Sequence, residues 1–191
     1  SNDLDEYTIS ALKSGNCAIN SWGVGTKLIT SADSPSLGGV YKLAASYQGD
    51  EIVPKIKISE DPEKINNPGY KKVVRIYNKE NKAEADLIML HDEEINTSQP
   101  LTVFHPTYTW KETTFEDYTI KELHKPLFVN GECKFKSKPI IEIQQYVQDE
   151  LNTLWDAYRR LTCPKTYKVD LSQELWDLKT NLLGDKIVQK Q

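Results

Sequence analysis

The chain has 191 residues, a formal net charge of −4 at pH 7 and 38% hydrophobic residues, which is enough for one large globular domain or slightly more. The acidic balance argues against a nucleic-acid partner, because such proteins usually carry a basic surface. No apolar run approaches the about 18 residues that span a bilayer. The opening SNDLDEYTIS is polar, unlike a signal peptide. We therefore expect a cytoplasmic protein with neither nucleic acid nor membrane as partner.

The cysteines and histidines give no metal-binding pattern. Cys17, Cys133 and Cys163 lie far apart without a C-x-x-C motif, and the three histidines are equally scattered. This pattern indicates reduced thiols and predicts no metal site. The chain also begins with Ser1, and its only methionine is Met89, so we expect a piece of a longer protein.

The first forty-five residues predict alternating helix and strand. Asp3 is the expected N-cap of a helix, with Glu6 as its capping-box partner, and Gly15-Asn16 ends that helix. A short strand is expected at Cys17–Trp22, followed by a glycine loop. Parallel strands of this kind need partners, so residues 1–45 are predicted to be the last βα units of an irregular (β/α) barrel.

Residues 46–191 are predicted to form an α+β C-terminal portion, which makes the fold class α/β. Strands are expected between residues 55 and 135, and Asn130-Gly131 is typical of a two-residue hairpin turn. The expected runs, one of which begins just before residue 46, are VYKLAASY, KIKIS, KKVVRIY, AEADLIML and LTVF. Helices are expected at 139–161, a stretch of about six turns by its apolar spacing, and at 172–183 with Ser172 as N-cap. The residues from Gly184 onward are expected to fray.

The glycine loop Gly23-Val24-Gly25-Thr26 has two interpretations. Glycines let a ligand approach the backbone and its N–H groups closely, yet the sequence is neither a P-loop nor a dinucleotide fingerprint, and glycines often only make tight turns. A second loop, Ser1-Asn2-Asp3, stands at a helix start, where backbone amides favour an anion. Both loops are expected at the carboxyl ends of successive strands, where α/β barrels build their sites.

Several long strings resemble one known family. They are SNDLDE, INSWGVGTKLITSADSPSLGGVYKL, PKIKISEDPEKINNPGYKKVVRIY, FHPTYTWK and YKVDLSQELWDL. They resemble nicotinate phosphoribosyltransferases over nearly the whole chain, as their C-terminal two-fifths. The resemblance implies an enzyme of NAD biosynthesis that forms nicotinate mononucleotide and pyrophosphate from nicotinate and phosphoribosyl pyrophosphate. It further implies coupling to ATP hydrolysis with Mg²⁺, and a homodimer.

The resemblance also implies roles for the two loops. Ser1, Asn2, Asp3, Gly23, Val24, Gly25 and Thr26 would grip the ribose and its 5′-phosphate. Asp3 is the candidate catalytic residue, either orienting a ribose hydroxyl or favouring the developing positive charge. The family's phosphorylated histidine and nicotinate contacts lie upstream. His91, His105 and His124 are therefore read as structural, and the 191 residues alone as inactive and binding no cofactor. The alternative is a catalytically silent module that binds a phosphate ligand or a partner chain.

Overall fold

The computed structural model describes residues 3–108 and 110–188. Its internal contacts divide the chain into two compact units. The glycine-loop unit comprises Ser1–Tyr41 and Arg160–Pro164, and the sheet unit comprises Lys42–Arg159 and Lys165–Gln191.

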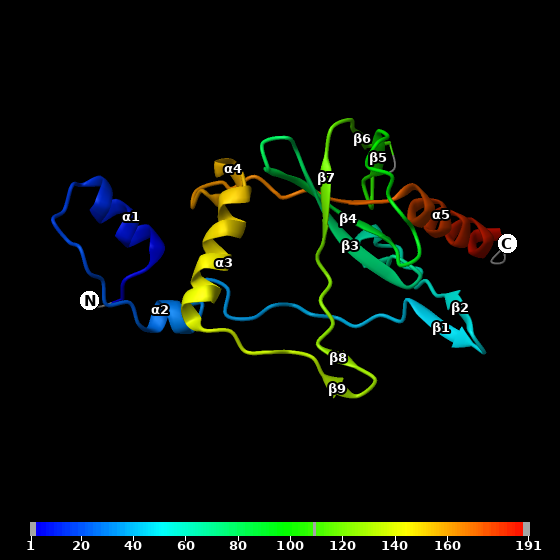
Figure 1. Cartoon of the computed structure of the whole chain (residues 1–191), viewed down its shortest axis with the longest axis horizontal. Coiled ribbons are helices and arrows are strands. Elements are labelled where there is room, and N and C mark those ends of the chain that lie inside the picture. Colours follow the sequence, from blue (N-terminus) through cyan, green and yellow to red (C-terminus); the bar gives the residue numbers. More distant parts are fainter. Residues whose placement is uncertain (1–2, 109, 189–191) are drawn as a thin grey trace. The chain divides into compact units, whose positions relative to one another are not determined.

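The sheet unit is built on a six-stranded mixed sheet in the order β6-β5-β10-β4-β3-β7 (Figure 1). Its strands are β3 (Lys71–Tyr77), β4 (Ala83–Leu90), β5 (Leu101–Phe104), β6 (Glu112–Phe115), β7 (Thr119–Glu122) and β10 (Val169–Leu171). The pairing of β10 with β4 is parallel and the other pairings are antiparallel. The short β10 thus joins the β3–β4–β7 part of the sheet to the β5–β6 part, so the last segment of the chain completes the sheet.

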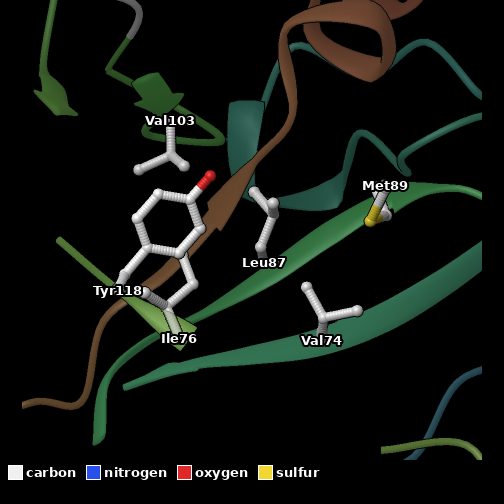
Figure 2. Close-up of a cluster of buried hydrophobic side chains, with 6 residues drawn as sticks. All are labelled: Val74, Ile76, Leu87, Met89, Val103 and Tyr118. Atoms are coloured by element: carbon white, nitrogen blue, oxygen red, sulfur yellow. The ribbon is translucent and has the colours of Figure 1, made fainter. Parts of the chain in front are cut away.

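One face of this sheet carries the hydrophobic core. Along β4, buried and half-buried residues alternate strictly, as expected for a strand with one face inward. The buried cluster consists of Val74, Ile76, Leu87, Met89, Val103 and Tyr118, which Figure 2 shows in close-up. The Tyr118 hydroxyl donates to the backbone carbonyls of Asn96 and Gln99, so burial leaves its polar end satisfied.

The helix α5 (Gln173–Val188) packs against β4 and β5. Ser172 is its N-cap, because the Ser172 Oγ accepts a hydrogen bond from Leu175 N at 3.2 Å. Leu175 is fully buried, and Trp176 packs against Phe104 with ring centroids 5.4 Å apart. The predicted cap is therefore confirmed. The helix extends through Gly184 to Val188, five residues beyond the predicted end, and residues 189–191 lie outside the described part.

Two hairpins lie outside the six-stranded sheet. They are β1 (Ala45–Gln48) with β2 (Glu51–Pro54), and β8 (Phe128–Val129) with β9 (Glu132–Cys133). The second is the hairpin predicted from Asn130-Gly131, and both turn residues have positive φ, 50° and 81°, as a type I′ turn requires.

The expected strand at Lys55–Ser59 is wrong, although β3, β4 and β5 fall where they were predicted. Asn66 explains the difference. Its Oδ1 accepts from Lys57 N at 2.6 Å, and its Nδ2 donates to Lys55 O at 3.2 Å. One side-chain amide thus takes the backbone groups that a neighbouring strand would have used. A short 3₁₀ turn, Pro62–Lys64, follows.

The expected helix of about six turns is also wrong in length. It divides into α3 (Ile140–Thr153) and α4 (Asp156–Arg159). Leu154 between them is extended, with ψ 143°. The Lys82 ammonium donates to Asn152 O at 2.7 Å, which satisfies a carbonyl of the last turn and stabilises the helix end there.

The glycine-loop unit contains two helices, α1 (Glu6–Ser14) and α2 (Thr26–Ile29). The predicted end of the first helix at Gly15-Asn16 is confirmed, with Asn16 at φ 54°. The predicted strand at residues 17–22 is not formed. A strand needs a hydrogen-bonded neighbour, and the described residues of this unit include no strand that could pair with it.

Candidate functional site

Asp5, and not Asp3, caps the first helix. The Asp5 carboxylate accepts a hydrogen bond from Thr8 N at 2.7 Å, so the helix begins two residues later than Asp3 capping would require. The hydrogen bonds from Thr8 lower the pKa of the Asp5 carboxyl, with a further contribution from Lys27. Because this carboxylate already takes an amide of the first turn, the α1 N-terminus is less suited to a phosphate than the sequence indicated.

Asp3 is therefore free of the helix-capping role. It lies in the left-handed region at φ 42°, a conformation that aspartate adopts more readily than most residues. Its side chain is exposed and makes no hydrogen bond or ion pair with the residues that the structure describes. Ser1 and Asn2, the other predicted residues of this loop, lie outside the described part.

The glycine loop runs directly into α2, with Gly25 as its N-cap residue. The Gly25 carbonyl accepts from Leu28 N and Ile29 N, while the amides of Val24, Gly25 and Thr26 bond to nothing in the described chain. A Cβ at Gly25 would meet no atom within 4 Å. The backbone here is thus open on the side where a ligand could approach.

An ion pair links the two predicted loops. Lys27 Nζ lies 3.6 Å from the Asp5 carboxylate, which holds the segment after the glycine loop beside the segment after Asp3. A hollow of about 130 Å³ lies there, lined by Asp5, Glu6, Tyr7, Lys27, Ala32 and Asp33. The lining has three acidic side chains and one lysine, and it includes none of the predicted phosphate-binding residues. This hollow is therefore unsuited to a phosphate, and the open glycine backbone is the better candidate.

The three histidines all make local contacts or face solvent. His91 stacks on Tyr70 with ring centroids 4.4 Å apart, His105 accepts two backbone hydrogen bonds, and His124 is exposed. No described group of three or more histidine, cysteine, aspartate or glutamate side chains could hold a metal ion. All three cysteines are free thiols.

A half-buried charged network was missed in the sequence. Arg75 forms two hydrogen bonds with the Asp86 carboxylate, at 2.7 and 2.9 Å, and the Tyr167 hydroxyl donates to Asp86 at 3.1 Å. The bond to Asp86 raises the pKa of Arg75, and burial raises that of Tyr167. Arg75 and Asp86 are direct cross-strand partners. The signal was a charge in the middle of each of two strand sequences, Arg75 in KKVVRIY and Asp86 in AEADLIML, which form an ion pair once the strands are paired.

The fold and these positions define a mixed α/β domain preceded by a small glycine-loop unit. The family model described as "Nicotinate phosphoribosyltransferase C-terminal domain" matches residues 70–179, which is more than half of the chain. The chain belongs to the nicotinate phosphoribosyltransferase family.

Its relatives carry the same name. A nicotinate phosphoribosyltransferase of Bacillus subtilis (strain 168) is 46% identical over 180 residues, which cover 94% of this chain and 37% of the relative. One of Caenorhabditis elegans is 38% identical over 178 residues, covering 92% and 31%. The chain thus spans about a third of the length of these relatives.

A solved structure supports the fold. The crystal structure of human nicotinic acid phosphoribosyltransferase superposes with a TM-score of 0.57 and 22% identity, covering 62% of this chain and 24% of that one. Among the described residues, no helix is long and apolar enough to cross a membrane.

Proposed function

We propose that the chain is the C-terminal part of an enzyme that joins nicotinate to phosphoribosyl pyrophosphate, forming nicotinate mononucleotide and pyrophosphate. Support comes from the family membership and from relatives of that name that match over more than nine-tenths of this chain. The full-length enzyme would be a cytoplasmic homodimer coupled to ATP hydrolysis. Residues 1–45 would contribute the last βα units of its barrel, and the rest of the full-length protein would supply strand partners for the unpaired segment at 17–22.

The open backbone of the glycine loop carries the proposal for the site. Three successive amides, at Val24, Gly25 and Thr26, are unbonded within the described chain, and no side chain shields Gly25. Backbone amides are rigid donors that need little reorganisation, so they suit a phosphate that must be held in one place. The Thr26 hydroxyl adds a further donor, and Gly23 beside this backbone is exposed.

Anchoring the 5′-phosphate would position the sugar for displacement at its C1. As pyrophosphate leaves, positive charge grows on the ribose, and a fixed anchor keeps the ring in line between base and leaving group. Asp3, exposed and released from helix capping, would orient a ribose hydroxyl or favour that charge. Either role requires a carboxylate that is free to face the sugar.

The ATP-coupled step is assigned to no residue of this chain. ATP and Mg²⁺ would supply the driving force for synthesis in the full-length enzyme. The described residues contain no cluster of metal-binding side chains, and the three histidines have local contacts or none. The residues present therefore do not fit a magnesium site of their own, and we derive no step through it.

Replacing Gly25 by valine in the full-length enzyme tests the site. A side chain at Gly25 meets no atom of this chain, and the isopropyl group blocks the approach of a phosphate. We expect the KM for phosphoribosyl pyrophosphate to rise about tenfold or more, and the melting temperature checks that the variant folds.

Gly38→Val is the matched control, since Gly38 is equally open and lies outside the loop. Its KM should stay at the wild-type value. Unchanged kinetics in Gly25→Val, with a normal fold, would remove the glycine loop from substrate binding.

A further inference from the structure

The sheet unit has a cavity that the proposed reaction does not use. It measures about 530 Å³, within the range of small-molecule sites. Its walls include Asp170 of β10, Lys168 just before that strand, Thr113 and Phe115 of β6, His105 just after β5, and Tyr158 of α4. It thus brings together two sequence strings, FHPTYTWK and YKVDLSQELWDL, that the glycine-loop site leaves unexplained.

Asp170 is the unusual residue of this cavity. Its register partner on β4 is Leu87, a member of the core cluster in Figure 2, so its side chain lies on the apolar face of the sheet. The side chain is only 2% exposed. Its Oδ2 lies 3.4 Å from Lys168 Nζ, and its Oδ1 has no hydrogen-bond partner among the described residues. A buried carboxylate oxygen without a donor is unfavourable, so this oxygen is suited to accept a bond from a ligand.

His105 supplies the complementary group. Its Nδ1 accepts from Thr107 N at 3.1 Å and from Tyr108 N at 3.0 Å, which fixes the neutral tautomer with hydrogen on Nε2. The pairing of Leu171 with Phe104 places His105 opposite Asp170 across the two strands. The cavity therefore offers one fixed donor and one fixed acceptor on neighbouring strands.

The remaining lining selects the kind of molecule that could occupy this cavity. Two acidic side chains, Glu84 and Asp170, oppose two basic ones, Lys165 and Lys168, so the cavity is formally neutral and unlike a phosphate site. Phe115 and Tyr158 add aromatic rings to the lining, with the ammonium groups of Lys168 and Lys165 5.9 and 5.7 Å from the respective ring centroids. The Lys168 side chain is 36% exposed, its ammonium bonds the Thr113 hydroxyl, and its contact with Asp170 is long. A ligand donor could displace this flexible side chain and bond to the carboxylate directly.

We propose that this cavity binds an uncharged planar ring that presents an N–H donor beside a hydrogen-bond acceptor, as an aryl carboxamide or the edge of a nucleobase does. The N–H would donate to Asp170, the acceptor would receive the His105 Nε2–H, and the ring would lie between Phe115 and Tyr158. An aryl carboxylate such as nicotinate offers no N–H and would be repelled by Asp170. The site therefore goes beyond the proposed function.

Benzamide and benzoate are matched probes, since they share a ring and differ in the donor. Saturation-transfer NMR on the full-length protein, with nicotinate present in excess to fill a substrate site, should detect benzamide with a Kd below about 10 mM, as expected for so small a ligand. Benzoate should bind at least about tenfold more weakly, a ratio that one lost charge-assisted hydrogen bond produces. Adenine is the probe for a nucleobase edge. Binding of either benzamide or adenine supports the proposed site.

Two variants locate the binding. Asp170→Asn keeps the shape but weakens the acceptor, and His105→Asn keeps an oxygen to accept from Thr107 and Tyr108 while removing the Nε2–H. Each should weaken benzamide binding about tenfold. The exposed Asp92→Asn is the control for a lost charge and should leave binding unchanged. Thermal melting checks that each variant folds. If one variant fails to fold, the other variant alone is enough to locate the binding.

Three results would overturn the proposal. One is that neither benzamide nor adenine binds at all. Another is that benzamide and benzoate bind equally. The third is that benzamide binds equally well to wild type, Asp170→Asn and His105→Asn. Because every assay contains excess nicotinate and no turnover is measured, these outcomes are independent of whether Gly25 binds phosphoribosyl pyrophosphate.

Discussion

The two units of the chain differ in how much of their apolar surface they bury themselves. In the sheet unit, Ile76, Leu87 and Val103 are completely buried. In the glycine-loop unit, Leu4 is the single large hydrophobic side chain among the described residues that is buried, whereas Ile29 is 85% and Leu37 95% exposed. The sheet unit is therefore stabilised by its own hydrophobic core, whereas the glycine-loop unit buries too few apolar side chains to form one.

This difference bears on where the two units obtain their stability. Burying a leucine or isoleucine side chain contributes about 1.5–3 kcal/mol, so a segment that exposes several of them lacks the main stabilising contribution to folding. The chain spans about a third of the length of its relatives, and we expect the predicted barrel to bury the exposed apolar residues. We expect the glycine-loop unit to depend on packing against the remainder of a longer protein.

The largest effect should come from the core of the sheet unit. Leu87→Ala leaves a cavity at the centre of the cluster in Figure 2 and should lower the free energy of unfolding of the 191-residue chain by about 2–5 kcal/mol. Leu37→Ala, at an exposed position, should change it by less than about 0.5 kcal/mol. Urea denaturation followed by tryptophan fluorescence measures both.

Equal losses in the two variants would contradict the comparison between the units. Repeating Leu37→Ala in the full-length protein sharpens it. There we expect a clear loss of stability, because the rest of the protein would bury this side chain. An effect as small as in the 191-residue chain would show that the residue stays exposed.

The helix caps give a smaller and more selective test. Ser172 is buried, accepts from Leu175 N and donates to the Glu93 carboxylate at 2.7 Å, so Ser172→Ala should cost roughly 1–2 kcal/mol of global stability. Asp5→Ala removes the corresponding cap of α1, but that helix buries no residue. It should speed amide hydrogen exchange at Thr8 without moving the denaturation midpoint of the sheet unit.

Ser172→Thr is the conservative control and should retain most of the stability, because a threonine hydroxyl can cap the same amide. A midpoint that shifts as much for Asp5→Ala as for Ser172→Ala would mean that the two units unfold as one.

Local patterns in the sequence correctly predicted the elements that are determined by their own residues. The alternation in Ala83–Leu90, the Asn130-Gly131 turn and the Ser172 cap were all readable. The turn between β1 and β2 was not predicted, although Gly49-Asp50 is a hairpin signal and Gly49 has φ 63°. The strand expected at 55–59 failed because a distant residue, Asn66, competes for its backbone.

The candidate sites show the same limit. Gly23 and Gly25 indicated an open loop from the sequence. That Asp5 rather than Asp3 caps the helix depends on one hydrogen bond, from Thr8 N to the Asp5 side chain. Asp170 could not be singled out from sequence, because its importance arises only when β10 inserts between β4 and β5 and places a carboxylate on the apolar face. The parallel pairing that does so joins segments distant in the chain, and no local pattern encodes it.

The smallest expected effect concerns the pH dependence of the sheet unit. Burial raises the pKa of the Glu93 carboxyl above its ordinary value of 4.5, against the opposing hydrogen bonds from Ser172 and Leu90 N. The folded state then holds this proton at a higher pH than the unfolded state does, so stability is gained as the pH falls through the raised pKa and lost as it rises.

Glu93→Gln keeps an acceptor oxygen and removes the titration. Relative to this variant, the wild type should become more stable between neutral pH and about 4.5, as measured by urea midpoints at several pH values. A difference that stays constant, or one that grows with rising pH, would show that the hydrogen bonds outweigh burial at this carboxyl.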